Sequence, residues 1–120
     1  MYQFLMYICV MNNSQLYKGS LSLIILKLLE ENKRMYGYEI TQRVKELSDG
    51  SIVVTEGALY PTLHKMEAEG FLKTETEAVG KRIRKYYSLT PVGKNVVEEK
   101  VNEFLAFIKT MGTVLNVNVA

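Results

Sequence analysis

The chain has few of the residues that catalysis, metal binding or covalent cross-linking require. Its 120 residues include one cysteine, Cys9, one histidine, His64, and no tryptophan. A single cysteine cannot form a disulfide within the chain, and a single histidine does not make a metal site. No glycine-rich phosphate loop is followed by Lys-Ser or Lys-Thr, and no carboxylate pair has a metal-binding spacing. The sequence therefore predicts a protein that is not an enzyme, has no cofactor and resides in the reducing cytoplasm.

Long apolar runs are also missing. No apolar segment reaches the ~20 residues that a membrane-spanning helix needs, so we expect no membrane association. The first eleven residues, MYQFLMYICVM, are apolar but lack the positive start and the cleavage site of a signal peptide. We interpret residues 1–13 as an N-terminal extension, disordered or packed on a partner. Met11 is an alternative start of the chain.

Three stretches have the apolar spacing of helices: residues 19–32, 36–50 and 56–70. The first is apolar on almost every side, which is typical of a helix buried by several neighbours, and a second subunit is one candidate for such a neighbour. Asp49-Gly50 is a stop signal for the second helix. Thr55 is a suitable N-cap for the third.

Pro61 lies in the middle of the third helix. A proline in a helix interior removes one hydrogen bond and clashes with the carbonyl four residues earlier, at a cost of roughly 3 kcal/mol. Here the residue four positions earlier is Gly57, which has no side chain to add to the crowding. We expect a kinked but continuous helix. The alternative is that Pro61 starts the helix and residues 55–60 form a loop.

After Gly70 the pattern alternates with period two. Residues 71–77 and 82–89 are typical of strands joined by the glycine-containing turn AVGK. Alternation places Arg82, Arg84 and Tyr86 on one face, and Ile83, Tyr87 and Leu89 on the other. The chain's excess of positive charge is confined to this region, since residues 73–90 carry five cationic and two acidic side chains.

Helical spacing returns after the hairpin, with Thr90 as N-cap and Pro91 at the first helical position. The order helix, helix, helix, hairpin, helix predicts a mainly α fold with a small β-hairpin. We interpret residues 14–90 as a winged helix-turn-helix DNA-binding domain and residues 91–120 as a C-terminal dimerisation helix.

The third helix is the expected recognition helix, whose N-terminal end reaches base edges. Small residues there permit close approach to DNA, and polar or planar side chains permit contact with bases. A cationic hairpin beside it is typical of phosphate binding, although such charges also occur on hairpins that are merely solvated. Of Tyr36 and Tyr38 we expect Tyr38 to lie nearer DNA. The predicted DNA contacts are Tyr38, Thr55, Gly57, Ala58, Tyr60, Thr62, Lys65, Lys81, Arg82 and Arg84.

The last helix has apolar residues at alternating spacings of four and three, which is the heptad pattern of paired helices. Packing on its own domain accounts only for its first turns. We therefore expect a homodimer that uses this helix and the first one, and that reads a pseudo-palindromic operator with half-sites about one helical turn apart. The predicted dimer or effector residues are Leu21, Ile25, Val97, Val101, Phe104, Phe107, Ile108 and Met111.

Four stretches together resemble the PadR family of bacterial transcriptional regulators, in particular its small members: YKGSLSLIILKLL, MYGYEI, TEGALYPTLHKMEAEGFL and GKRIRKYYSLTPVGK. The resemblance implies a dimeric repressor whose winged helix binds promoter DNA. It also implies a small aromatic or lipophilic effector that binds between the C-terminal helices and the first helix and relieves repression. Tyr38, Tyr60, Thr62 and Lys65 correspond to DNA contacts, and residues 80–84 to the wing.

Some members stack planar ligands on a tryptophan of the last helix, and this chain has none. Phe104, Phe107 and Ile108 either line an effector pocket instead or simply pack in the dimer. A winged helix that binds another protein without specific DNA binding is the alternative function. Such a module would not need four cations in its hairpin.

Overall fold

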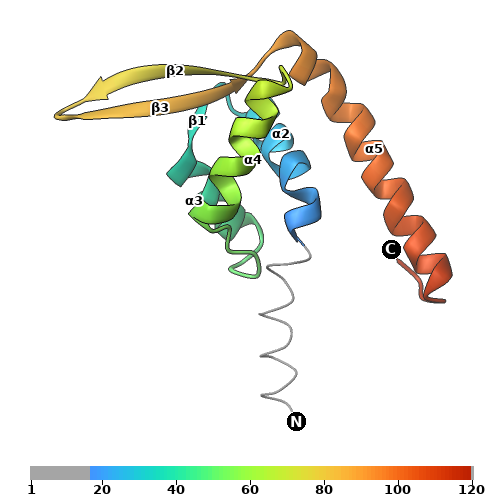
Figure 1. The fold of residues 1–120 in the computed structure, drawn as a ribbon. Helices are drawn as coiled ribbons and strands as arrows, with labels where there is room; N and C mark the ends of the chain where they lie inside the picture. Colours follow the sequence, from blue (N-terminus) through green and yellow to red (C-terminus); the bar gives the residue numbers. More distant parts are fainter. Residues whose placement is uncertain (1–16, 120) are drawn as a thin grey trace.

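The computed structural model describes residues 17–119, so the predicted extension over residues 1–13 lies outside the described residues. The elements along the chain are the 3-10 helix η1 (Tyr17–Ser20), α2 (Leu21–Glu31), β1 (Met35–Tyr36), α3 (Gly37–Leu47), α4 (Glu56–Ala68), β2 (Leu72–Val79), β3 (Arg82–Leu89) and α5 (Pro91–Val114). The predicted mainly α fold with a small β-hairpin and a long last helix is confirmed (Figure 1).

Helix α2 lies at the centre of the chain's own core. It contacts α3, α4, β3 and α5. Leu21 and Ile25 are completely covered there. The apolar character of this side of the helix therefore reflects burial within one chain, whereas Leu23 and Ile24 are only half-buried and line an apolar groove. The prediction that Leu21 and Ile25 contribute to a dimer surface is not supported by their positions.

Helix α3 begins one residue later and ends three residues earlier than predicted. At its start the Tyr36 amide donates to the Glu39 carboxylate at 3.1 Å. At its end Asp49 and Gly50 adopt left-handed backbone, with φ of 53° and 82°. Left-handed residues cannot continue a right-handed helix, and the Gly50 amide instead donates back to the Lys45 carbonyl at 2.8 Å.

Helix α4 is continuous through Pro61, so the alternative of a loop over residues 55–60 is wrong. Thr55 is its N-cap, as predicted, and its hydroxyl oxygen accepts a hydrogen bond from the Ala58 amide at 3.2 Å. Leu59, Leu63 and Met66 form the buried face of the helix. A side chain at Gly57 would meet nothing within 4 Å, so the surface around this residue is open.

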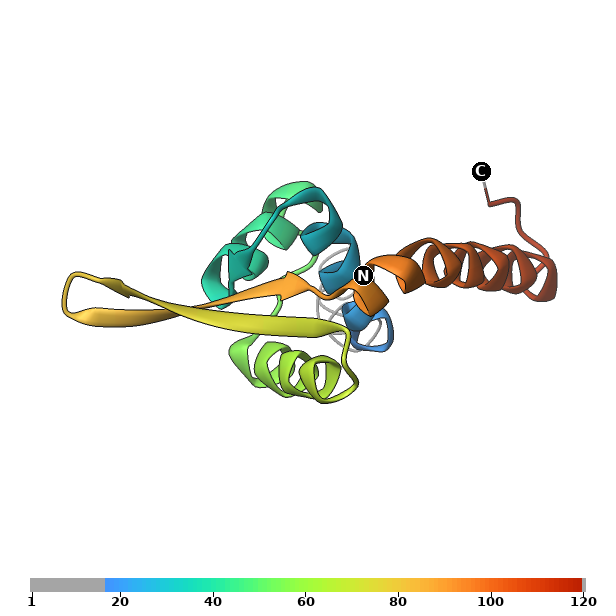
Figure 2. The same ribbon diagram turned by 90° about the horizontal axis from the view of Figure 1, so that it is seen from above.

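The sheet has three strands in the order β1-β3-β2, where the sequence predicts two. The hairpin of β2 and β3 turns through Gly80 and Lys81, with Gly80 at a φ of 62°, the positive value that two-residue hairpin turns with a leading glycine use. The added strand β1 pairs Tyr36 with Tyr86. The hairpin projects from the helices on the side opposite to α5 (Figure 2). We call this hairpin the wing.

Helix α5 begins as predicted, with the Thr90 hydroxyl accepting from the Gly93 amide at 3.0 Å. A side chain at Gly93 would collide with the Phe71 carbonyl, so this end of α5 packs closely on the chain entering β2. The other end extends away from the domain (Figures 1 and 2). No helix in residues 17–119 is both long enough and apolar enough to cross a membrane.

Candidate nucleic-acid interface

A hollow of about 670 Å³ lies where the wing, the start of α3 and the first half of α4 meet. It brings together four of the predicted DNA contacts from three separate segments, namely Tyr38, Tyr60, Arg82 and Arg84. The other residues around it are Tyr36, Gly37, Val79, Ile83, Lys85 and Tyr87. Four tyrosines and three cations therefore share one surface, which suits planar bases and anionic phosphates.

The two tyrosines predicted for DNA contact, Tyr38 and Tyr60, differ in solvent exposure and in packing. Tyr38 is 64% exposed and lies in the first turn of α3. Tyr60 is 37% exposed, and its ring packs against the backbone of Gly37 at the start of α3. The glycine permits this close approach because any side chain there would collide with the ring. Tyr60 therefore also fixes the contact between α3 and α4.

The remaining predicted contacts on α4 fall into two groups. Thr55, Gly57 and Lys65 are exposed. Ala58 is half-buried and packs against the core, so its small size serves the packing of α4. The Thr62 hydroxyl donates to the Ala58 carbonyl at 2.9 Å. Ala58 and Thr62 are thus less available to a ligand than the sequence suggests.

The four cations of the wing have different surroundings. Lys81 and Arg82 are exposed near the turn, and no ion pair within residues 17–119 involves them. Lys85 lies on the side of the sheet that faces α4, 4.0 Å from the Glu67 carboxylate. Arg84 lies with its guanidinium carbon 4.0 Å from the ring centre of Tyr36. Of these four cations, only Lys85 has an ion pair within residues 17–119, so Lys81, Arg82 and Arg84 carry unpaired positive charge.

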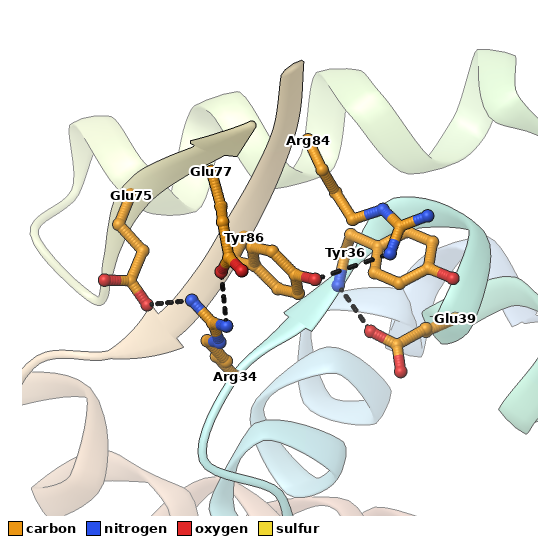
Figure 3. Close-up of polar contacts among 7 residues, drawn as sticks. All are labelled: Arg34, Tyr36, Glu39, Glu75, Glu77, Arg84 and Tyr86. Carbon is orange, nitrogen blue, oxygen red and sulfur yellow. Dashed lines mark hydrogen bonds and ion pairs between the residues drawn. The ribbon is translucent and has the colours of Figure 1, made fainter. Parts of the chain in front are cut away.

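An aromatic cluster connects the wing to α3 on the outer face of the sheet (Figure 3). The Tyr36 and Tyr86 rings meet edge to face, with centres 5.6 Å apart. Arg84 covers the ring of Tyr36, and Arg34 covers the ring of Tyr86 at 3.9 Å. A long hydrogen bond of 3.5 Å from Arg84 to the Tyr86 hydroxyl raises the pKa of the Arg84 guanidinium, which stays charged.

Arg34 is bound to two carboxylates on β2. Its guanidinium donates to Glu75 at 2.8 Å and to Glu77 at 2.6 Å (Figure 3). These hydrogen bonds raise the pKa of Arg34. Arg34 and Lys85 are not among the residues predicted for this region, and Tyr36 is predicted to lie farther from DNA than Tyr38. The only available signal was the spacing of Glu75 and Glu77, which places both carboxylates on one face of a strand.

The predicted dimer or effector residues of α5 lie at different depths. Val97 is part of the core, and Val101, Phe104 and Ile108 are half-buried. Phe107 and Met111 are exposed. Together with these two, the large exposed apolar side chains in the second half of α5 and after it are Leu105, Val114, Leu115, Val117 and Val119.

An apolar groove of about 540 Å³ runs between α2, α3 and α5. Leu23 and Ile24 from α2, Leu47 from α3 and Val101 from α5 are among its walls. Residues 17–119 contain no group of three or more His, Cys, Asp or Glu side chains arranged to hold a metal ion.

A helix-turn-helix with an attached wing, and with cations and tyrosines gathered between them, defines a winged-helix protein of the transcription-regulator class. The family model of the transcriptional regulator PadR-like family matches residues 25–99, which is more than half of the chain. The chain belongs to this family. Its members are transcriptional regulators and not enzymes, which agrees with the prediction from the sequence.

Known proteins of similar sequence support the assignment. The chain is 38% identical over 82 residues to the transcriptional regulator Rv3488 of Mycobacterium tuberculosis, covering 68% of this chain and 73% of that protein. It is also 34% identical over 97 residues to an uncharacterised protein X of Lysinibacillus sphaericus, covering 78% of this chain and 86% of that protein.

Solved structures agree with the fold. A transcriptional regulator from Clostridium thermocellum matches with a TM-score of 0.75 and 30% identity, over 83% of this chain and 94% of that one. A PadR family regulator from Eggerthella lenta matches with a TM-score of 0.74 and 28% identity, over 98% and 97%. Bacillus subtilis PadR in complex with operator DNA matches with a TM-score of 0.62 and 31% identity, over 68% of this chain and 45% of that one.

Proposed function

We propose that this chain is a homodimeric transcriptional repressor that acts on DNA in the cytoplasm and is released by a small aromatic or lipophilic effector. The observation that carries the DNA-binding part is the hollow that holds Tyr38, Tyr60, Arg82 and Arg84. Its residues come from α3, α4 and the wing, the three parts of a winged helix that contact DNA. The similar structure of B. subtilis PadR with operator DNA supports the same partner for this chain.

The two kinds of residue in the hollow have separate roles in the proposed complex. Arg82 and Arg84 in the hollow, together with Lys81 at the wing turn, neutralise phosphates, which gives affinity for any duplex and a strong dependence on salt. Tyr60 lies on α4 beside the open surface of Gly57, where it reaches base edges and supplies selectivity.

Fluorescence anisotropy on DNA from the chain's own upstream region, over a salt series, tests this proposal. Scrambled duplex of equal length is the control. We expect the upstream DNA to bind at least ~1000-fold more tightly, as specific sites do. Equal binding to both duplexes at every salt concentration would contradict specific recognition of that region.

Two variants separate the roles of the hollow. Tyr60→Ala should weaken binding to the upstream DNA much more than binding to scrambled DNA. Arg82→Ala with Arg84→Ala should weaken both and reduce the slope of log affinity against log salt by about one to two units. Unchanged DNA affinity in the arginine variant would favour the alternative function, a winged helix that binds another protein.

The proposed dimer uses the exposed apolar side of α5. Leu105, Phe107, Met111, Val114 and Leu115 leave a wide apolar surface in a single chain, and surfaces of this kind mark association sites. The apolar groove beside Ile24 and Val101 lies next to the covered side of the same helix. Its volume is within the range of small-molecule sites, so we place the effector there, against the partner's α5.

Light scattering coupled to gel filtration measures the assembly. We expect a mass of two chains, and a mass of one chain for Leu105→Asp with Phe107→Asp. Glu99→Gln, on the same helix, is the control because it changes a charge outside the apolar side. A two-chain mass for the double aspartate variant would contradict this interface.

A further inference from the structure

We infer that Arg34 is a positioning residue for DNA binding, which holds the wing at a fixed angle to α3. This inference rests on the proposed DNA-binding function and assigns a role to residues that the hollow itself does not include. Arg34, Glu75 and Glu77 are here called the Arg34 clamp.

The clamp spans the whole width of the sheet. Arg34 immediately precedes β1, at one edge, whereas Glu75 and Glu77 lie on β2, at the other edge. Between them the guanidinium crosses the central strand β3 and lies on the ring of Tyr86 (Figure 3). One side chain therefore connects both edge strands and covers the strand between them.

The connection continues into the helix-turn-helix. β1 has only two residues and leads directly into α3. Tyr36, its second residue, contacts the Tyr86 ring, and its amide donates to Glu39 in the first turn of α3. A rotation of the wing against α3 would thus break the contacts of Arg34 with β2, of Tyr36 with Tyr86, or both.

The chemistry of arginine suits this task. Its planar guanidinium offers donors in a fixed fork, so it binds two carboxylates at once while its face stacks on an aromatic ring. Isolated ion pairs on a surface contribute little, and the side chain of Arg34 is 38% exposed. Here two charge-assisted hydrogen bonds and a stacked ring act on one group, which restricts its geometry more than a single pair does.

The clamp also separates the two arginines of the cluster by role. Arg34 is neutralised by two carboxylates, so it has little attraction left for phosphate. Arg84, on the adjacent ring, has no ion pair within residues 17–119 and keeps its charge for a ligand. Arg34 holds the ring of Tyr86, which contacts the ring of Tyr36 beneath Arg84. The clamp therefore determines the orientation of Arg84 toward DNA.

The first test measures the wing without DNA. Spin labels at Lys81→Cys and Lys45→Cys are introduced in a Cys9→Ser background, and the labelled protein is diluted with an excess of unlabelled chain. Pulsed electron paramagnetic resonance then reports the distance between the wing turn and α3 within one chain. We expect one narrow distribution in the parent and a broader one after Glu75→Gln with Glu77→Gln. Arg43→Gln is the control, since it breaks an ion pair contained within α3. Equal widths in the parent and the double glutamine variant would overturn the inference and leave the proposed function untouched.

The second test uses the duplexes that test the proposed function. Glu75→Gln with Glu77→Gln removes two negative charges near the proposed DNA-binding surface. The change in charge alone should tighten binding to every duplex. A positioning role predicts instead that Glu75→Gln with Glu77→Gln lowers the ratio of upstream to scrambled affinity, by roughly tenfold if one well-placed contact is lost. Arg34→Lys, which keeps the charge but not the fork, should lower the same ratio. A ratio equal to that of the parent in both variants would overturn the inference.

The two failures are distinguishable. If the parent does not prefer the upstream DNA to the scrambled DNA, the proposed function is contradicted at that site. The role of Arg34 in DNA binding is then contradicted as well. If the parent is selective and the clamp variants are equally selective, only the inference fails. Thermal unfolding of each variant verifies that the loss of selectivity does not come from unfolded protein.

Discussion

The ring of Tyr60 lies directly against the α-carbon of Gly37. A methyl group at residue 37 would be 2.5 Å from the Tyr60 hydroxyl oxygen and 2.9 Å from ring carbon Cζ. A Cβ atom does not come this close to a non-bonded heavy atom, so the present contact of α4 with the start of α3 depends on the absence of a side chain at residue 37.

The first prediction follows from this contact. Gly37→Ala should displace the Tyr60 ring and weaken binding to upstream DNA, because the ring then no longer lies where the hollow needs it. In a Tyr60→Ala background the same change should have little further effect, since the space is then free. Anisotropy with all four combinations measures this coupling. Equal losses in both backgrounds would show that Gly37 acts independently of Tyr60.

The second prediction concerns Gly57, where stability and DNA binding should respond in opposite directions. Gly57→Ala should stabilise the fold by up to about 1 kcal/mol, because alanine is the better helix former and its methyl group meets nothing within 4 Å. The same methyl group occupies the open surface that DNA approaches, so selective affinity should fall. Urea unfolding and anisotropy on the same preparation measure both. A stabilised variant with undiminished selectivity would remove Gly57 from the DNA surface.

The third prediction tests the cap of α4. Thr55→Ala should cost about 1 kcal/mol of stability, because the Ala58 amide loses its acceptor. Thr55→Ser keeps the hydroxyl oxygen and should retain most of the stability. Chemical denaturation of the three proteins measures the difference. If the serine variant is as unstable as the alanine variant, the methyl group of Thr55 matters and not its hydroxyl.

The fourth prediction is a pH dependence from Tyr87. Burial raises the pKa of its phenol in the folded chain. In the unfolded chain the phenol loses its proton near its ordinary pKa of about 10, so above that pH the unfolded state binds fewer protons than the folded state. Stability should therefore be constant with respect to this group below about pH 10 and should fall as the pH rises further.

Tyr87→Phe should reduce the slope of stability against pH in that alkaline range. Tyr38→Phe is the matched control, because it removes an exposed phenol that lies outside the core. Denaturation midpoints measured in steps through the alkaline range distinguish the two. Identical slopes for the two phenylalanine variants would contradict the assignment to Tyr87.

Local signals in the sequence predict the helices and the wing well. Thr55 and Thr90 are caps, Gly80 forms the turn, and alternation over residues 82–89 gives the two faces of β3, because each of these features depends on neighbours within a few residues. The continuity of α4 is also a local feature. The ring of Pro61 crowds the carbonyl of the residue four positions earlier, and this residue is Gly57, which has no side chain.

Features that depend on distant pairing could not be predicted in this way. β1 has two residues and forms only because Met35 and Tyr36 pair with β3, about fifty residues later. The hydrogen bonds of Arg34 to Glu75 and Glu77 join residues more than forty positions apart. The burial of Leu21 and Ile25 depends on how many elements pack around α2, and an apolar pattern does not tell whether the covering element belongs to the same chain.

Strand β3 is held in the core at one end only. Tyr87 and Leu89 are buried, whereas Ile83 near the turn is 78% exposed. Substitutions at Tyr87 or Leu89 are therefore limited by folding, while those at Arg82 or Ile83 leave the core intact. The outer half of the strand is free to change in sequence, so the charge of the wing can be altered without a compensating gain in stability elsewhere.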